Sequence, residues 1–300
     1  AKRLSLPSFS FASLLRREED KLLCLIDYFH TVATAGPEFL LEVVSFARRV
    51  EPRLPDGFWQ NLDKPLAPVR LESGKIEEAQ GCLQADFANK FLGGGALCGG
   101  NLQEEIRFAT CPECYVGMLF CESMLDNEVI YIVGAKQYSD HTGYGHSLRF
   151  IRLRAHAELP HDKLNRCGPH IVAFDAQRYL IGDQQYEEEC IERELLKAYA
   201  ACRGDLDEDS GPRQTGFATG NWGCGAFGGD PQLKILIQWL AASATDRELV
   251  YFPFENEHLS SVPAVIRAVQ SSGARCSDLY RSLFGHAPQK VFDTLRKSLL

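Results

Sequence analysis

The stretch FLGGGALCGGNLQEEIRF, residues 91–108, places five glycines directly before two adjacent acids, Glu104 and Glu105. Glycine adopts backbone conformations closed to other residues and lets other groups approach the main chain, at an entropic cost. Three glycines in a row followed by two more exceed what one turn requires. Two interpretations stay open here: the glycines turn a corner, or they clear space for a ligand.

The acids admit a structural and a chemical interpretation. If Asn101 is the N-cap of a helix, Glu104 closes a capping box and Glu105 is solvated. If the acids do chemistry, they should differ in role, because adjacent helical side chains point about 100° apart. A helix N-terminus favours the carboxylate, so a proton donor there needs burial or a neighbouring charge such as Asp86. Two acids with separated pKa values are typical of glycoside cleavage.

A second glycine loop lies in TGNWGCGAFGGDPQLKILIQWL, residues 219–240, with G-x-G-x-x-G spacing over 223–228. Asp230 and Pro231 then predict the N-cap and first residue of a helix. Backbone amides in such a loop favour phosphate binding. The missing G-K-[ST] argues against an ATP-hydrolysing loop, and no clear strand is expected before it, which weakens a dinucleotide site. A plain glycine-rich turn is the structural alternative.

Together, the two loops predict a ligand that contains both a pyrophosphate and a sugar. Tyr144 and Phe254 could stack on a base, although each is also compatible with a core or loop aromatic. Arg149, Arg152 and Arg154 alternate along a predicted strand. They either contact an anionic ligand or form a solvated face.

Composition narrows the class of protein. The 300 residues are 45% apolar with a net charge of -8, which argues against a broad basic surface for duplex DNA. Eleven scattered cysteines favour a reducing compartment, and CPEC (111–114) lacks the second ligand pair of a zinc site. No apolar run approaches the roughly 20 residues of a membrane span. The chain starts at Ala1, so it could be a piece of a longer protein that lacks its targeting segment.

The chain pattern predicts a helical start followed by an α/β domain. Apolar periodicity predicts two helices, over about 19–36 and 37–50, before a proline-rich segment at 52–68. Short apolar runs that alternate with helical patterns then predict a sheet covered on both faces. The predicted strands are APVRLE, CLQADFA, EVIYIVGA, PHIVAFDA and ELVYFPF, and the predicted helices start at Gln103, in QYEEECIERELLKAYAAC and at DPQLKILIQWLAASA.

These residues resemble the poly(ADP-ribose) glycohydrolase family. Its signature is a triple glycine, a gap of six to eight residues and then Gln-Glu-Glu; here seven residues separate Gly95 from Gln103. DFANKFLGGG, QEEIRF, QYSDHTGYG, TGNWGCGAFGGD and VYFPF extend the similarity in order over roughly residues 65–260. The resemblance implies a macrodomain-like α/β fold with a mixed sheet flanked by helices. It also implies an N-terminal helical accessory region over 1–65 and a catalytic domain over 66–300.

The resemblance further implies cleavage of ribose–ribose O-glycosidic bonds in poly(ADP-ribose), without metal or cofactor, releasing ADP-ribose. Glu105 would be the general acid and then base, Glu104 would hold ribose hydroxyls, and Asp86 would support them. The implied substrate-binding residues are Gly93, Gly94, Gly95, Asn89, Gln103, Ile76, Glu77, Tyr144, Asn221, Gly225, Ala226, Phe227 and Phe254.

The implied partners are poly(ADP-ribose) and poly(ADP-ribosyl)ated proteins, with no duplex nucleic acid and no membrane, for a monomer in the nucleus or cytoplasm. A non-catalytic ADP-ribose-binding module is one alternative, since it needs the second glycine loop but not two acids. An NAD-dependent oxidoreductase is another, and it leaves Gln103, Glu104 and Glu105 unexplained. The preference for chain ends or interior bonds stays open.

Overall fold

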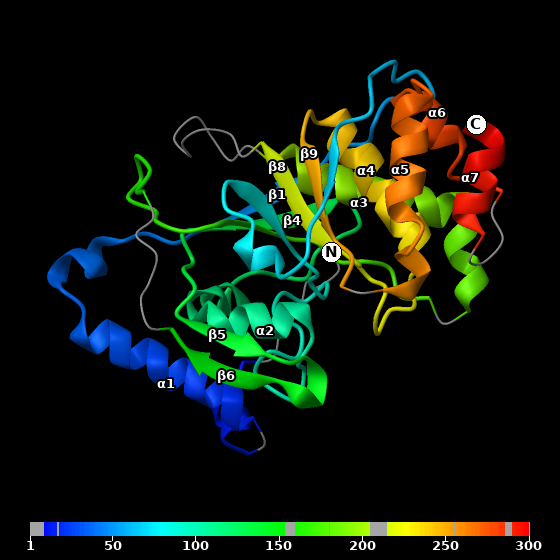
Figure 1. Ribbon diagram of the computed structural model, residues 1–300. Coiled ribbons are helices and arrows are strands. Elements are labelled where there is room, and N and C mark those ends of the chain that lie inside the picture. The colour runs from blue at the N-terminus through cyan, green and yellow to red at the C-terminus, as the bar shows by residue number, and fades with distance from the viewer. Residues whose placement is uncertain are drawn as a thin grey trace, which may run out of the picture.

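Seven strands form one mixed sheet in the order β1-β4-β7-β3-β8-β9-β2 (Figure 1). The computed structural model describes residues 9–16, 18–153, 160–179, 181–204, 215–254, 256–285 and 290–299. The strands of the sheet are β1 (Ser45–Val50), β2 (Val69–Leu71), β3 (Cys82–Asp86), β4 (Glu128–Val133), β7 (His170–Ala173), β8 (Gly216–Gly220) and β9 (Glu248–Phe252). A separate antiparallel hairpin joins β5 (Ser139–Thr142) to β6 (Arg149–Arg152).

Strand direction brings the two glycine loops to the same edge of the sheet. Strands β7, β3, β8, β9 and β2 are parallel to one another, and β4 runs antiparallel to β7 and to β1. The carboxyl ends of β3 and β8 therefore lie next to each other. Ligands of open α/β sheets bind outside such carboxyl ends. Asp86 ends β3, and the second glycine loop begins one residue after β8.

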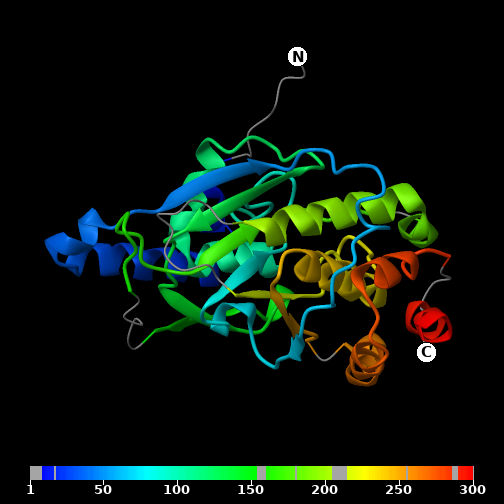
Figure 2. The ribbon, with the colours of Figure 1, turned by 90° about the horizontal axis from the view of Figure 1, so that it is seen from above.

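Helices cover both faces of the sheet. In Figure 1, α1 and α2 lie with the β5–β6 hairpin on one side, and α3 to α7 lie on the other. Figures 1 and 2 both place α1 and α7 at opposite ends of the molecule. None of the helices in the described ranges is long and apolar enough to cross a membrane. The helices are α1 (Glu19–Thr34), α2 (Gln103–Thr110), α3 (Glu188–Arg203), α4 (Pro231–Ala244), α5 (Val262–Ser271), α6 (Cys276–Arg281) and α7 (Val291–Leu299).

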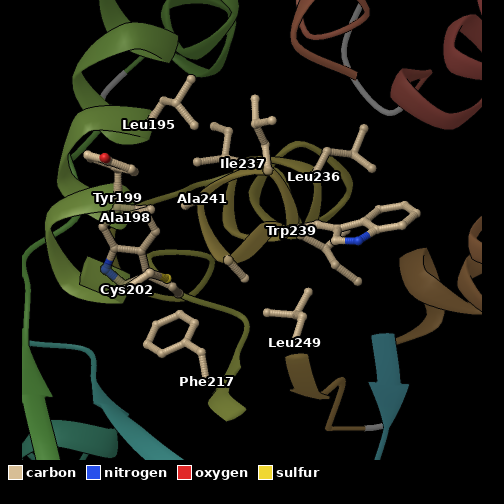
Figure 3. Close-up of a cluster of buried hydrophobic side chains, with 14 of the residues drawn as sticks. Leu195, Ala198, Tyr199, Cys202, Phe217, Leu236, Ile237, Trp239, Ala241 and Leu249 are labelled. Atoms are coloured by element: carbon tan, nitrogen blue, oxygen red, sulfur yellow. The ribbon is translucent and has the colours of Figure 1, made fainter. Parts of the chain in front are cut away.

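The larger hydrophobic core lies between the sheet and helices α3 and α4 (Figure 3). Trp239 of α4, Leu195 of α3 and Phe217 of β8 are fully buried in it. On the opposite face, Ile130 and Ile132 of β4 pack with α2 in a second cluster. Successive strand residues point to opposite faces, so the continuous apolar strands supply both cores.

The predicted helix over 37–50 is wrong. This segment forms a short 3-10 helix, Pro37–Leu41, and then strand β1, which pairs antiparallel with β4. The apolar spacing of this segment is compatible with a helix and with a strand. Pairing with the edge of β4 that would otherwise be open favours the strand. The division of the chain at residue 65 stays a prediction, although β1 contributes the edge strand of the sheet.

The predicted strands at β2, β3, β4, β7 and β9 are confirmed, as are helices α2, α3 and α4. The expectation that no strand precedes the second glycine loop is wrong, because β8 ends at Gly220. Its sequence, GFATG, carries a glycine at each end and resembles a turn when taken alone. Buried pairing with β3 on one side and β9 on the other makes it a central strand.

Candidate active site

Glu104 is held by the backbone at the start of the first glycine loop and just before it. Its Oε1 accepts a hydrogen bond from the Gly93 N–H at 2.6 Å, and its Oε2 accepts one from the Asn89 N–H at 2.8 Å. The side chain is buried. Charge-assisted bonds to backbone N–H groups are strong, so they fix this carboxyl group in one orientation.

Glu105 uses a different set of donors. Its Oε1 accepts from the Gly95 N–H at 3.0 Å, and its Oε2 accepts from the Leu102 N–H at 2.9 Å. The second bond caps the start of α2, because Leu102 is the N-cap and Glu105 is the third residue of the helix. The predicted cap was therefore one residue early: Glu105 rather than Glu104 caps the helix. The two acids have distinct environments, as their helical spacing requires.

The glycines make room for these two carboxyl groups. A Cβ atom at Gly94 would lie 2.8 Å from Glu104 Oε2 and 2.9 Å from Glu105 Oε1, so both oxygens flank one point above the loop. Gly93 and Gly94 also have φ values of +88° and +48°, which L-residues rarely adopt. At Gly100, a Cβ atom would lie 2.8 Å from the Glu105 carboxyl carbon. The glycines therefore both turn the chain and admit the acids.

Asp86 lies at the end of β3, fully buried, and neither of its carboxyl oxygens has a hydrogen-bond partner among the described residues. Burial raises the pKa of Asp86 to about 8, the charges of Glu105 and Glu77 add to this rise, and Arg107 opposes it. Burial and Asp86 also raise the pKa of Glu104. Two backbone N–H bonds oppose the rise in the pKa of Glu104, whereas Asp86 accepts no hydrogen bond among the described residues.

Arg107 is a buried cation that the sequence pattern did not single out. Its Nη1 donates to Gln84 Oε1 at 2.8 Å, and its Nε lies 3.0 Å from Glu77 Oε1. Its positive charge opposes the rise in the pKa of Asp86. The only signal in the sequence is its place in QEEIRF, three residues after Glu104.

The second glycine loop connects β8 to α4. Asp230 is the N-cap of α4, with its side chain accepting from the Gln232 N–H at 2.7 Å, as predicted. The N–H groups of Cys224, Gly228 and Gly229 bond within the loop. Among the described residues, none accepts a hydrogen bond from the N–H groups of residues 225–227. Unpaired amides near a helix N-terminus suit an anion such as phosphate.

One cleft of about 120 Å³ connects the two loops. It contains Gln103, Tyr144 and Asn221 together with the backbone of the second loop. Phe87, just after β3, and Ala176, just after β7, also line it; sequence analysis missed both, and their only signal is their position after strand ends. The full lining is Phe87, Ala88, Leu102, Gln103, Tyr144, Ala176, Asn221, Trp222, Gly223, Gly225, Ala226 and Phe227.

Three polar side chains fix the walls of this cleft. Gln103 accepts from the Phe87 N–H at 2.7 Å and donates to the Ala85 carbonyl at 3.1 Å, which ties α2 to the end of β3. Tyr144 Oη accepts from the Gln103 N–H at 3.0 Å. Asn221 donates to the Pro253 carbonyl at 2.8 Å. These bonds join the first loop to the hairpin turn and to the end of β3, and they join the second loop to the segment after β9.

Six of the predicted residues line this cleft: Gln103, Tyr144, Asn221, Gly225, Ala226 and Phe227. The acids Glu104 and Glu105 do not line it, and neither do Asp86, Asn89 and the triple glycine. Three further predicted residues lie elsewhere. Ile76 is fully buried beside β8 and β9, so its side chain has no free surface. Glu77 faces a separate cavity of about 730 Å³ that Arg107 also lines. Phe254 is half exposed near Gly220, at the end of β9.

The remaining sequence candidates lie away from the loops. Arg149 pairs with Asp20 at 3.7 Å and Arg152 with Asp27 at 2.7 Å, whereas residue 154 lies outside the described residues. CPEC contributes two buried thiols, Cys111 and Cys114, to the core beside α2. Within the described ranges, the one group with three closely spaced potential metal ligands comprises Glu42, His161 and Cys167, which line the separate cavity.

The sheet, its helices and the two loops define an α/β protein with a ligand cleft at the carboxyl edge of its strands. Residues 57–261 match the family profile described as "Poly (ADP-ribose) glycohydrolase (PARG), Macro domain fold". Since this match covers more than half of the chain, the protein belongs to the poly(ADP-ribose) glycohydrolase family, and its α/β sheet has the macro-domain fold.

Curated relatives agree with this assignment. Poly(ADP-ribose) glycohydrolase 1 of Arabidopsis thaliana is 33% identical over 97% of this chain and 66% of its own length. Poly(ADP-ribose) glycohydrolase 1 of Caenorhabditis elegans is 37% identical over 84% of this chain and 34% of its own length. The chain thus spans less than two thirds of these relatives.

Among solved structures, a mutant poly(ADP-ribose) glycohydrolase of Deinococcus radiodurans in complex with ADP-ribose is similar. It covers 79% of this chain and 98% of its own, with 17% identity and a TM-score of 0.43. A likeness this distant supports no inference about the site.

The raised pKa of Asp86 predicts a pH-dependent gain in stability for Asp86→Asn. Between its ordinary pKa of 3.8 and the folded value of about 8, the folded state holds a proton that the unfolded state releases. The free energy of unfolding therefore falls as pH rises through this window. Asparagine carries no titrating proton. At pH 8.5 the free energy of unfolding of the variant should therefore exceed that of wild type by on the order of 2 kcal/mol.

Urea denaturation of both proteins at pH 4.5 and pH 8.5 measures this difference. The variant's advantage should be larger at pH 8.5. An equal difference at both pH values would show that Asp86 titrates normally in the folded state.

Proposed function

We propose that this chain hydrolyses ribose–ribose O-glycosidic bonds in poly(ADP-ribose) and releases ADP-ribose. The observation that carries the proposal is the pair of adjacent acids, Glu104 and Glu105, each held by its own two backbone N–H groups. The cleft beside them ends at the unpaired amides of residues 225–227. This arrangement suits a ligand with a sugar next to a diphosphate, and the family match names such a polymer.

In the proposed mechanism, Glu105 protonates the glycosidic oxygen, which leaves as a 2′-hydroxyl group when the ribose–ribose bond breaks. Glu105 then removes a proton from the water that replaces it. Glu104 accepts hydrogen bonds from ribose hydroxyls beside the scissile bond. Asp86 and Asn89 support the positions of the two acids. Gln103 holds the start of α2 against β3, which keeps both acids aligned with the substrate.

The rest of one ADP-ribose unit occupies the cleft and its rim. Amides of Gly225, Ala226 and Phe227 donate to the diphosphate. Tyr144 closes over the ligand from the hairpin turn, and Phe254, half exposed at the end of β9, stacks on adenine. Because the Ile76 side chain is buried, its contact with the adenine edge comes from its backbone, next to Glu77.

The wider setting belongs to the same proposal. Residues 1–65 serve as an accessory region to a catalytic domain over 66–300, and the chain acts as a monomer in the nucleus or cytoplasm. Its partners are the polymer and poly(ADP-ribosyl)ated proteins. No cofactor enters the proposed chemistry, because two carboxyl groups suffice for acid and base catalysis.

Replacement of the proposed acid tests the mechanism. Glu105→Gln keeps the shape and one acceptor oxygen but cannot donate and take back a proton. Release of ADP-ribose from poly(ADP-ribose) should fall by about 10²- to 10⁴-fold, while the affinity for ADP-ribose stays near that of wild type.

Product release is measured by chromatography, and affinity is measured by calorimetry. Equal activity in both proteins would remove Glu105 from its role. A wild-type chain that binds the polymer without shortening it would instead be a poly(ADP-ribose)-binding module.

A pair of glycine variants tests the packing of the loop against Glu105. Gly100→Ala places a methyl group 2.8 Å from the Glu105 carboxyl carbon, whereas at Gly99 the nearest atom is an ordinary 3.7 Å away. Displacement of the acid should lower kcat by about 10²-fold in Gly100→Ala. Gly99→Ala is the matched control, with kcat within about twofold of wild type. Similar kcat values for the two variants would contradict the proposal that Gly100 makes room for the Glu105 carboxyl group.

A further inference from the structure

Helix α1 packs against two elements of the candidate site, α2 and the β5–β6 hairpin. It lies along β6 and against α2 (Figures 1 and 2). Asp20 accepts from the Phe150 N–H at 2.7 Å, so the helix also holds the hairpin that carries Tyr144. A helix in this position can transmit its own placement to the first glycine loop.

Lys21 of α1 is fully buried, which is rare for a lysine. Its Nζ donates to the Ala96 carbonyl at 3.1 Å, the Gly100 carbonyl at 2.8 Å and the Cys98 carbonyl. All three acceptors lie between the triple glycine and α2. The three donors of the ammonium group are therefore used on one short segment of backbone.

Burial of this charge carries a cost that the loop must offset. Burial lowers the pKa of Lys21, while the negative charges of Glu18 and Glu105 oppose that change. Glu18 lies 3.6 Å from the ammonium group and accepts from the Asn101 side chain at 3.3 Å. The ammonium group thus faces both the loop backbone and the field of Glu105.

The three carbonyls lie between the two N–H groups that hold Glu105. Gly95 donates from one side of the segment and Leu102 from the other. The Cys98 and Gly100 N–H groups both donate to the Gly95 carbonyl, which folds the segment into turns. A glycine-rich segment keeps many accessible conformations, so it also needs an anchor to the rest of the fold. Lys21 supplies that anchor from a helix almost 80 residues earlier in the chain.

We propose that Lys21 is a positioning residue for Glu105. By holding the carbonyls of residues 96–100 it keeps the Gly95 and Leu102 N–H groups aimed at the carboxyl group. The expected effect on activity rests on the proposed function. The positioning role itself does not, because the hydrogen bonds to Glu105 exist without substrate. The hydrogen-bond and ion-pair partners of Lys21 among the described residues do not include the second glycine loop. The positioning role of Lys21 is therefore separate from affinity for ADP-ribose.

The test compares Lys21→Met with Lys197→Met. Lys197 of α3 is equally buried and donates to the Leu125 and Glu128 carbonyls, both at 2.6 Å, on the other face of the sheet. Both variants lose a buried ammonium group, so both should lose stability. Hydrogen exchange of the Gly95 and Leu102 amides, kcat on poly(ADP-ribose) and the Kd for ADP-ribose are measured at a temperature where all proteins are folded.

In Lys21→Met, amide exchange at residues 95 and 102 should accelerate at least tenfold and kcat should fall by about 10- to 100-fold. Its Kd for ADP-ribose should change less than about threefold, and Lys197→Met should leave kcat and both amides as in wild type. Unchanged exchange at both amides would overturn the positioning role whatever the activity. An equal fall in kcat in Lys197→Met would also overturn it, since general destabilisation would then explain the loss.

If Lys21→Met does not fold, Lys21→Gln, which keeps a shorter donor, takes its place with the same expectations. A wild-type chain without hydrolysis would refute the proposed function alone. In that case the exchange measurement still decides the role of Lys21.

Discussion

The site depends on hydrogen bonds between two carboxyl groups and the backbone of a glycine loop. Glu104 accepts from the Asn89 and Gly93 N–H groups, and Glu105 accepts from the N–H groups of Gly95 and Leu102. These bonds replace the water that burial removes from the acids. A Cβ atom at Gly94 or Gly100 would lie within 3 Å of these carboxyl groups, so the packing of the acids requires glycine at both positions.

The sheet converts this local constraint into a ligand cleft. Because β3 and β8 are adjacent and parallel, the acid-bearing loop and the second glycine loop emerge at the same edge. A hydrogen bond of Gln103 ties the first loop to β3, and one of Asn221 ties the second loop to the segment after β9. The helices on the far face, with Trp239 and Leu195 in the core, keep the strands in this order and have no direct part in the cleft.

Much of this arrangement follows from sequence, because strong local patterns agreed with tertiary structure. The apolar strand Glu128–Val133 and the Asp230 cap are examples. Local pattern failed where long-range pairing decides, as in β1 and β8. It also could not show that the space above Gly94 is filled by the acids themselves, or that Arg107 and Lys21 are buried beside them. Such contacts join residues far apart in the chain and leave no periodic signal.

The central claim is that both loops hold one ADP-ribose unit, with its ribose at the acids and its diphosphate at the second loop. A crystal structure of this chain with ADP-ribose tests it most directly. The claim predicts diphosphate oxygens within hydrogen-bonding distance of the N–H groups of residues 225–227, and a ribose beside Glu104 and Glu105. A ligand bound in the separate cavity beside Glu77 and Arg107, with the second loop empty, would contradict it.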